Sequence, residues 1–484
     1  MTQPSTSSPR PASLREWLNH LQSTGRLAIA RTNVPLKHHL AAITKKLDGK
    51  KAVYFPSPDG HAVPVVSGFM SRREWIAEAM GVPGTELLKI FRQSVESPTP
   101  WVEINKEDAP CQEVILTEIN LHQQLPIPTH SEHDNGPYLT AGLLITRNPK
   151  TGVQNVSIHR IQVHAKDRMA ILMLPRHAMA FYRMAEADNQ ALPVAIAIGV
   201  DPLTMLASQA ITPIDHDELE IAGSLHGQAL KVVKCVSNDL RVPSNAEIII
   251  EGHIPPTIRE LEGPFGEFPK YYSSREAREI INVDLITHRK SPIFHTIVPA
   301  EMEHLLLGSI PREASFLGYL QRSFPTVEDV HLSMGGVGRY HLFIKFRKQR
   351  EGEAKNLILC AFGAHYDIKH VVVVDTDVDV HDPQQIEWAI ATRFQADKDL
   401  VLISGAQGSV LDPSTTVNNS SSDGGAIPIH AQGISAKMGL DATKPISYKD
   451  HTFTKVRIPG EDTLNLEDEI QSCGYVNFDD AATK

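Results

Sequence analysis

Apolar residues near the start of the chain recur at helical spacing. They lie three or four residues apart, at Leu14, Trp17, Leu18 and Leu21. Ser13 and Glu16 have the spacing of a capping box, and Gly25 is of the type that commonly ends a helix. We therefore expect a docking helix without chemistry here, followed by mixed strands and helices up to about residue 115.

From about residue 116 the pattern changes to short apolar segments separated by glycine and proline. Residues 140–164 predict two strands joined by a turn at 148–152, and residues 175–189 predict a helix. Further strands are expected at 193–202, 229–243 and 246–256. Many short strands with such turns are typical of a closed or nearly closed sheet. This middle domain is expected to cover residues 116–310.

The last third of the chain has longer apolar runs. Residues 356–364 and 369–379 are continuous apolar segments, which favour strands in a sheet covered on both faces. Residues 383–395 have a helical pattern. We expect a C-terminal α/β domain over 311–455 and a tail or helix over 456–484. The polar Ser/Gly-rich segment 412–426 is expected to be a functional or mobile loop.

Length and charge limit the class of protein. The chain has 484 residues, of which 41% are hydrophobic. This predicts two or three domains with packed cores, the first being an N-terminal α/β domain over 13–115. A formal net charge of −10 argues against a nucleic-acid-binding protein, because such proteins carry a basic patch or stripe.

No segment signals a membrane or a secretory route. No apolar run approaches the ~18–20 residues that cross a bilayer. Residues 1–12 lack the apolar core of a signal peptide and are expected to be a disordered tail. The four cysteines lie far apart, which indicates neither a zinc site nor a disulfide framework and favours a cytoplasmic protein.

Two glutamates enclose a turn rich in glycine and proline, Glu262-Gly-Pro-Phe-Gly-Glu267. The turn can fold both carboxyl groups toward one site, where acids in different environments act as general acid and base. The alternative is a surface turn with solvated glutamates. Arg160 lies among apolar neighbours in a predicted strand, and a buried guanidinium requires carboxylates or a bound anion. It can serve the two glutamates or form a structural salt bridge.

Candidate ligands for a divalent cation include Asn155, His177 and Glu218. One amide oxygen, one imidazole and one carboxylate suit Mn²⁺ or Mg²⁺ better than structural zinc, although spacing alone does not select these three residues. The glycine-rich segment 335–338 lacks the spacing of a nucleotide-binding loop and is interpreted as a turn. Lys369 precedes an apolar strand and can reach an anion or remain solvated.

Together these segments resemble the UbiD family of decarboxylases over about residues 14–445. The resemblance is carried by NVSIHRIQVH, PRHAMAFYRMAEADNQALPVAIAIGVDP, DELEIAGSLHG, EGHIPPTIRELEGPFGEFPKYYSS, KHVVVVDTDVDVHDP and GLDATKP, in that order. The element from Glu262 to Glu267, with Arg160 earlier in the chain, is a specific signature of this family.

The resemblance implies a mixed α/β (α+β) fold. A flavin-reductase-like split β-barrel would form the middle domain, with an α/β domain on either side. Arg160, Glu262 and Glu267 would be catalytic around prenylated FMN. Asn155, His177 and Glu218 would bind Mn²⁺ (or Mg²⁺), which ties the flavin phosphate to the protein. The other cofactor-binding residues would be Ser157, Ile158, His159, Arg176, Ser208 and Lys369, with Ser208 beside a K⁺ site.

The implied reaction is the reversible decarboxylation of a small aromatic, heteroaromatic or α,β-unsaturated carboxylic acid, with release of CO₂. A covalent adduct with prenylated FMN would accept the electron pair left on the substrate, because no side chain offers such a sink. Glu267 would protonate the carbon that lost CO₂, and Arg160 and Glu262 would set its proton affinity. The candidate substrate-pocket residues are Phe268, His304, Arg312, Ile427 and His430. His304 and Arg312 can also be explained as a helix cap and a salt bridge.

Family members form dimers or larger oligomers through the C-terminal domain, so we expect a homodimer or hexamer. A UbiX-type flavin prenyltransferase would supply the cofactor. Two alternatives are an FMN-dependent reductase or oxidase on the same barrel, which would consume NAD(P)H, and a non-catalytic assembly scaffold.

Overall fold

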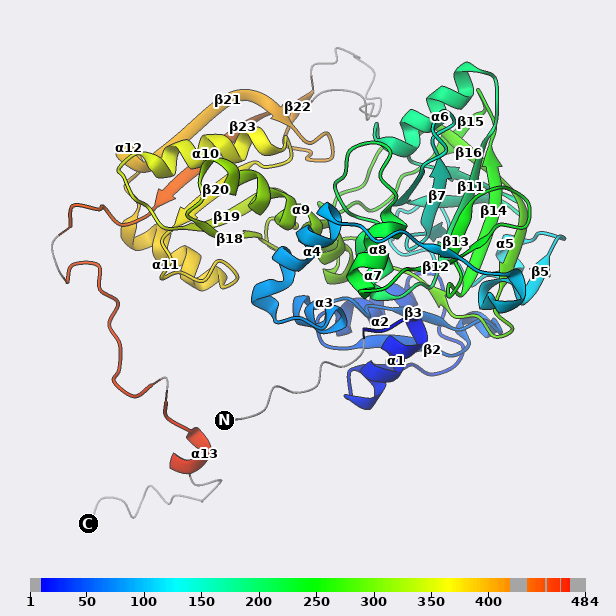
Figure 1. Ribbon diagram of the computed structural model, residues 1–484, viewed down its shortest axis with the longest axis horizontal. Coiled ribbons are helices and arrows are strands. Elements are labelled where there is room, and N and C mark those ends of the chain that lie inside the picture. Colours follow the sequence, from blue (N-terminus) through cyan, green and yellow to red (C-terminus); the bar gives the residue numbers. More distant parts are fainter. Residues whose placement is uncertain (1–9, 418–432, 449–450, 462, 471–484) are drawn as a thin grey trace.

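The protein has a mixed α/β fold built around four sheets. The computed structural model describes residues 10–417, 433–448, 451–461 and 463–470. A large sheet domain lies at one end and a smaller α/β domain at the other, and the N-terminal segment packs against the large sheet domain (Figure 1). The tail expected over residues 1–12 lies mostly outside the described residues. From Arg10 the chain is held in place, because Nη1 of Arg10 donates to the carbonyl oxygen of Leu225 at 2.5 Å.

The predicted N-terminal helix is confirmed as α1 (Leu14–Ser23), and its four predicted apolar residues are all buried. A four-stranded sheet follows, in the order β1 (Leu27–Ile29), β2 (Ala52–Phe55), β3 (Val65–Ser67) and β17 (Phe294–His295). The helices of this segment are α2 (His39–Leu47), α3 (Arg73–Met80) and α4 (Leu87–Glu96), with short 3-10 helices at Pro58–Gly60, Gly84–Glu86, Lys106–Asp108 and Pro110–Gln112. Because β17 comes from much later in the chain, this sheet joins the N-terminal segment to the residues before helix α9 (Met302–Ser323).

The middle domain is a ten-stranded sheet in which every pairing is antiparallel. Its main path runs β6-β9-β10-β16-β14-β11-β7-β8, and β5 and β15 pair with β16. The bounds are β5 (Val114–Leu116), β6 (Tyr138–Leu139), β7 (Leu143–Arg147), β8 (Gln154–Ile158), β9 (Ile161–Ala165), β10 (Arg168–Ile171), β11 (Leu192–Ile198), β14 (Ile248–Ile254), β15 (Arg259–Glu262) and β16 (Glu276–His288). Among the described strands the path ends at β6 and β8, so the sheet is open, as a split barrel is.

Four helices and a small sheet complete the middle domain. The helices are α5 (Leu121–Gln124), α6 (His177–Ala187), α7 (Pro202–Ala207) and α8 (Glu218–His226). The small sheet has the order β13 (Arg241–Pro243), β12 (Lys231–Lys234) and β4 (Val102–Glu103). The helix expected over 175–189 is confirmed by α6.

The C-terminal domain has a mixed six-stranded sheet. Its order is β18 (Val327–Leu332), β19 (His341–Phe346), β20 (His370–Val374), β23 (Gly433–Ala442) and β21 (Leu400–Gly408), with β22 (Thr416–Val417) paired on β23. The helices of this domain are α10 (Glu353–Ala364), α11 (Pro383–Arg393) and α12 (Ala396–Asp399), and α13 (Leu466–Glu469) lies in the segment that follows it. The helix at 383–395 is confirmed as α11. The strand at 369–379 is confirmed as β20 over its first half, whereas residues 375–379 form a turn.

The strand predicted over 356–364 is wrong, because this segment belongs to helix α10 and reaches its last residue. Its buried residues Leu357, Ile358 and Ala361 follow helical spacing and face the sheet. A short apolar run does not distinguish a buried strand from a buried helix by composition alone. The correction leaves the α/β class of the domain unchanged.

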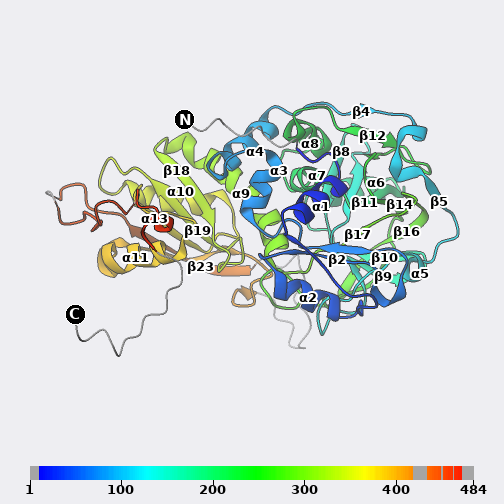
Figure 2. The same cartoon turned by 90° about the horizontal axis from the view of Figure 1, so that it is seen from below.

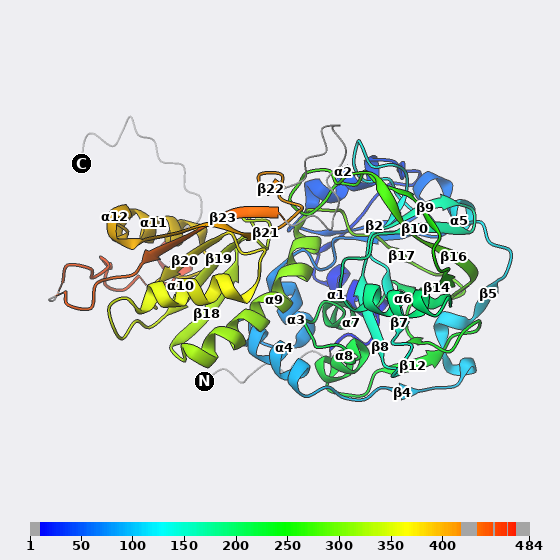
Figure 3. The same cartoon turned by 90° about the horizontal axis from the view of Figure 1, so that it is seen from above.

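Helix α9 lies between the middle and C-terminal domains, as the views from below and above show (Figures 2 and 3). It runs through residue 310, so the expected end of the middle domain falls inside a helix. One continuous core contains Trp17 of the first segment, Leu206 of the middle domain, Ile310 of α9 and Leu342 of the C-terminal domain. The segments therefore pack as one body. In the part of the chain that is described, no helix has the length and apolar character needed to cross a membrane.

Candidate active site

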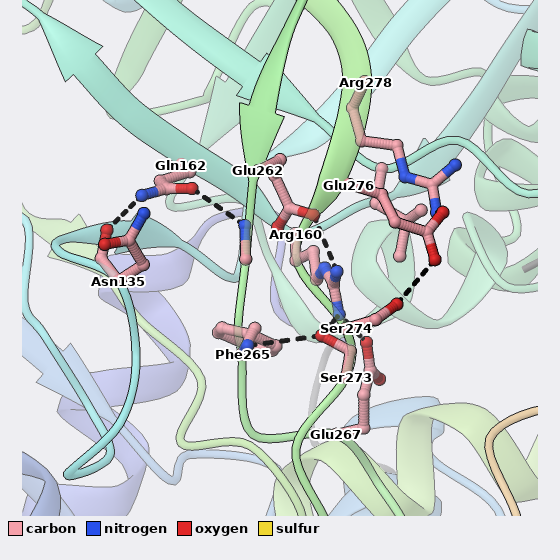
Figure 4. A network of polar contacts seen from close by, with 12 residues as sticks. Asn135, Arg160, Gln162, Glu262, Phe265, Glu267, Ser273, Ser274, Glu276 and Arg278 are labelled. Carbon is pink, nitrogen blue, oxygen red and sulfur yellow. Dashed lines mark hydrogen bonds and ion pairs between the residues drawn. The ribbon is translucent and has the colours of Figure 1, made fainter. Parts of the chain in front are cut away.

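Arg160 lies between β8 and β9 and holds the two glutamates of the turn. Its Nη2 donates to Oε2 of Glu262 at 2.7 Å, and its Nη1 donates to Oε1 of Glu267 and to Oγ of Ser273, the latter at 2.9 Å (Figure 4). Burial acts against the charge on Arg160, but the charges of Glu267 and Glu262 raise its pKa overall. The surface-turn alternative for the glutamates is therefore wrong.

The turn between the glutamates is held by its backbone. Glu262 is the last residue of β15, which pairs with β16. Gly263 has a φ of +90°, and a Cβ at this position would lie 2.5 Å from the carbonyl oxygen of Ser274, so glycine is required. The amide of Gly266 donates to Oδ1 of Asp134 at 2.8 Å. These contacts fold the chain back so that Glu267 reaches Arg160 from the side opposite Glu262.

The two glutamates differ in exposure. The side chain of Glu262 is fully buried, whereas that of Glu267 keeps 13% of its surface exposed. Glu267 lines a cavity of the protein and Glu262 does not. A molecule in this cavity can therefore touch Glu267, whereas Glu262 is linked to the cavity wall through its ion pair with Arg160.

The cavity has a volume of about 590 Å³ and lies where β8, α6, α8 and α9 meet the C-terminal domain. Most of the residues selected from the sequence line it, namely Asn155, Ser157, Ile158, His159, Arg160, Arg176, His177, Ser208, Glu218, Glu267, Phe268, His304 and Arg312. This volume falls within the range of cofactor and small-molecule sites, which is roughly 300–1,000 Å³.

The three candidate metal ligands converge at one end of the cavity. Asn155 lies on β8, and His177 and Glu218 are the first residues of α6 and α8. Nδ2 of Asn155 lies 2.9 Å from Oε1 of Glu218 and 3.5 Å from Nδ1 of His177. Among the described residues, no group of three or more His, Cys, Asp or Glu side chains is arranged to hold a metal ion. This set would take its third ligand from the Asn155 amide oxygen, which requires the amide to turn so that Oδ1 instead of Nδ2 faces Glu218.

The charges at this end suit a cation and a phosphate. Burial raises the pKa of Glu218 to about 8, so a nearby divalent cation would favour its ionised form. Burial, and then the charge of Arg176, lower the pKa of His177, which keeps the imidazole neutral as a metal ligand must be. The positive ends of α6 and α8 also point to this place, which favours an anionic group.

His159 supports a neighbouring cavity residue. Its Nδ1 lies 3.0 Å from the carbonyl oxygen of Leu172, and its Nε2 lies 2.9 Å from Oγ of Ser157. A carbonyl can only accept, so Nδ1 carries the proton and Nε2 accepts from the Ser157 hydroxyl. Burial lowers the pKa of His159 to about 4, which keeps the ring neutral. His159 thus orients Ser157 in the cavity wall.

The other end of the cavity is formed by α9 and the C-terminal domain. Nδ1 of His304 accepts from the amide of Ala300 at 3.0 Å, and Nη1 of Arg312 lies 3.3 Å from Oδ2 of Asp367. Both contacts are of the structural kind that the sequence left open, yet both residues also line the cavity. Burial, and then the charge of Arg339, lower the pKa of Arg312 to about 9.

The sequence analysis did not predict Arg339 as a residue of the site. It lines the cavity, and its guanidinium lies 4.1 Å from the ring centre of Phe268. It follows the glycine-rich segment 335–338, which was interpreted only as a turn. The signal was a basic residue directly after that turn.

The structure does not bring every candidate to the cavity. Lys369 is not among the lining residues, and its Nζ contacts Oδ2 of Asp412 at 2.7 Å and Oγ of Ser414 at 2.6 Å. Ile427 and His430 lie outside the described residues. Their expected roles stay predictions.

Three family models match successive parts of the chain. They describe the N-terminal, Rift-related and C-terminal domains of 3-octaprenyl-4-hydroxybenzoate carboxy-lyase and match residues 18–95, 102–302 and 305–442. The anhydromevalonate phosphate decarboxylase of Methanothermobacter thermautotrophicus is 40% identical over 386 residues, which cover 80% of this chain and 86% of that protein. The gallate decarboxylase of Lactiplantibacillus plantarum is 30% identical over 407 residues, which cover 80% of this chain and 82% of that protein.

The solved structures agree with the sequence comparisons. The UbiD-class enzyme HmfF from Pelotomaculum thermopropionicum, in complex with FMN, superposes with a TM-score of 0.90 and 46% identity, covering 95% of this chain and all of that chain. An evolved dimeric form of HmfF in complex with prFMN superposes with a TM-score of 0.86 and 44% identity, at the same coverage. These structures hold flavin in a fold that this chain shares almost throughout.

Proposed function

The chain belongs to the UbiD family of decarboxylases, and on this premise we propose that it decarboxylates a small aromatic, heteroaromatic or α,β-unsaturated carboxylic acid with prenylated FMN. Glu267 is the proton donor, and Arg160 and Glu262 position it. The observation that carries this proposal is the buried Arg160, bridged to one glutamate that lines the cavity and to another that does not.

The residues of this chain transfer one proton to the substrate in each turnover. Loss of CO₂ leaves an electron pair on the substrate carbon, and Glu267 gives its proton to that carbon. Because Glu262 neutralises part of the charge of Arg160, Glu267 can hold this proton beside a guanidinium. Glu267 then regains a proton from solvent, so each turnover consumes one proton. In the carboxylation direction the ionised Glu267 would accept the proton instead.

The residues at the cation end fit the cofactor. Asn155, His177 and Glu218 would hold Mn²⁺ or Mg²⁺ against the flavin phosphate, with Ser208 beside K⁺ and Ser157, Ile158 and Arg176 along the cofactor. When bound, prenylated FMN supplies the electron sink that side chains lack. A UbiX-type prenyltransferase would supply the cofactor to the cell.

The far end of the cavity supports a substrate with a second polar group. Arg312 and Arg339 are two cations in the cavity wall; Arg312 lies 3.3 Å from the carboxylate of Asp367, and the charges of Asp367 and Glu267 act on Arg339. His304 uses Nδ1 to accept from Ala300, so its remaining N–H is a donor. These groups would bind an acceptor, such as a carboxylate, carbonyl or hydroxyl, on the substrate.

The decisive variant is Glu267→Gln, in protein loaded by co-expression with a flavin prenyltransferase. A panel of aromatic, heteroaromatic and acrylic acids is screened for CO₂ release, and the variant is expected to lose turnover while keeping its cofactor. The matched control is Glu260→Gln on β15, because Glu260 pairs with His164 and Arg168 outside the cavity. Undiminished decarboxylation by Glu267→Gln would refute the assignment of the proton donor.

Mass spectrometry of the bound cofactor separates the alternatives. Prenylated FMN supports the decarboxylase, plain FMN with NAD(P)H consumption supports a reductase or oxidase, and no flavin after co-expression supports a scaffold.

A further inference from the structure

The carboxylate of Glu262 has a second partner, which lies outside the cavity. The hydroxyl of Tyr138, on β6, is 3.0 Å from Oε1 of Glu262 and 3.1 Å from Oε1 of Gln162. Tyr138 is completely buried, and it faces Gln162 across the β6–β9 pairing. Glu262 is thus held from one side by Arg160 and from the other by a tyrosine.

Gln162 presents an acceptor to this tyrosine. Its Oε1 accepts from the amide of Gly263 at 3.1 Å, and its Nε2 donates to the carbonyl oxygen of Asn135 (Figure 4). These two contacts decide which way the amide points. The Tyr138 hydroxyl therefore has one proton and two acceptors, Gln162 and Glu262. Burial, and then the charge of Glu262, raise the pKa of Tyr138, so the hydroxyl keeps its proton.

The other charged groups around Glu262 have donors of their own. Glu276, opposite Glu262 on β16, accepts from Arg278 at 2.5 Å and from Oγ of Ser274 at 2.6 Å. Asp134, in the loop before β6, accepts from the amides of Gly266 and Ser131, each at 2.8 Å. Arg160 and Tyr138 contact Glu262 directly. Glu267 is linked to Glu262 through Arg160. Arg160 therefore contacts both glutamates, whereas Tyr138 contacts Glu262 alone.

We propose that Tyr138 is a positioning residue that keeps Glu262 ionised, so that the proton shared by the two glutamates remains on Glu267. If Glu262 is protonated instead, its hydroxyl donates to Tyr138, and Tyr138 donates to Gln162. The chain of contacts accommodates both states, but the charged state gains a hydrogen bond to an ionised acceptor, which is the stronger kind. This role rests on the proposed function of Glu267.

The consequence is a loss of activity that depends on pH. Without the hydroxyl, Glu262 competes better for the shared proton, and Glu267 is left ionised against Arg160. At high pH Glu262 is ionised in the variant and in the wild type, so it does not compete for the proton. The fraction of Glu267 that is protonated is then equal in both proteins. The deficit should therefore grow as the pH falls and disappear as it rises.

The test is the pH profile of kcat for Tyr138→Phe in cofactor-loaded protein. The ring and its contact with Phe265, at 4.5 Å between centres, are kept. We expect a loss of about tenfold or more at the acid end, the worth of one hydrogen bond to a charged group, and convergence with wild type at the basic end. The control is Tyr182→Phe, which removes another fully buried tyrosine hydroxyl, bonded to Glu186 and Arg259 away from the cavity.

Equal loss at every pH, or no loss, would overturn the proposal, because a structural defect does not follow the titration of Glu262. If Tyr138→Phe does not fold, 3-fluorotyrosine at position 138 is used; its stronger donor should shift the profile in the opposite direction. If the wild type shows no decarboxylation, infrared titration can still test the role of Tyr138. The carboxylic acid band of Glu262 is identified as the band that is lost in Glu262→Gln. That band should appear at higher pH in Tyr138→Phe, and an unchanged band would refute the role of Tyr138.

Discussion

If Asn155, His177 and Glu218 hold a divalent cation as proposed, its removal should make the stability of this protein depend on pH through Glu218. Its carboxylate is buried between β8 and α8, where it accepts from the amide of Val156 at 2.6 Å and from Nδ2 of Asn155 at 2.9 Å. Burial nevertheless raises its pKa from 4.5 to about 8 when no cation is present.

The sign and size of this pH dependence follow from the linkage between proton binding and folding. A carboxyl group with a raised pKa in the fold stabilises the protein fully below about pH 4.5, and this stability is lost as the pH rises toward about 8. At 1.36 kcal/mol for each pH unit, the difference reaches about 5 kcal/mol as an upper value. A bound Mn²⁺ offers the counter-charge, so it should abolish this loss and release a proton on binding below pH 8.

The assay is chemical denaturation between pH 4.5 and 8.5, in chelator and in Mn²⁺, read as the difference between wild type and Glu218→Gln. We expect the metal-free wild type to lose stability relative to Glu218→Gln across this range, by about 3–5 kcal/mol at the top. Mn²⁺ should stabilise wild type only. Glu220→Gln, a change in the same helix outside the ligand set, should behave as wild type. Parallel pH curves for wild type and Glu218→Gln, or equal stabilisation of both by Mn²⁺, would refute the reasoning.

Two further predictions concern the far end of the cavity and the central sheet. Arg312→Gln should lower kcat/KM about 10- to 100-fold for acids with a second polar group, because a hydrogen bond to a charged group is lost, and should leave simple monocarboxylic acids unchanged; steady-state kinetics on paired substrates check this. An equal loss on both substrates would instead indicate a general defect from the loss of the Arg312–Asp367 ion pair. Gly252→Ala should destabilise the protein by about 1–3 kcal/mol in denaturation experiments, because the new methyl group would overlap the carbonyl oxygen of Asn282. Gly363→Ala in α10 has open space at the same point and should be neutral or stabilising by up to about 1 kcal/mol.

Much of the fold was accessible from local pattern. The helical spacing near residue 14 and the short strands of the middle domain appear in the structure as predicted, because period and turn residues are local properties. The segment 356–364 was misassigned for the same reason. Its apolar run is compatible with a strand or a helix, and only its packing against β20 and β23 selects the helix.

The candidate site was only partly accessible. Arg160 and the two glutamates are candidates by their chemistry, and the family resemblance joins them into one site. No local feature of the sequence identified Tyr138, which lies beside a leucine in a two-residue strand. Its role depends on the β6–β9 register, which places it opposite Gln162 and behind Glu262.

The sequence by itself determined which chemical groups this protein possesses: a guanidinium, two carboxyl groups around a tight turn, and a set of oxygen and nitrogen ligands. Only the tertiary structure decided what each group faces. Glu262 and Glu267 are equivalent in the sequence, yet pairing of β15 with β16 buries the first, and the turn that Gly263 permits carries the second to the cavity. Side-chain direction depends on register and on segments far apart in the chain. The difference between the glutamate that lines the cavity and the one that is fully buried depends on them as well.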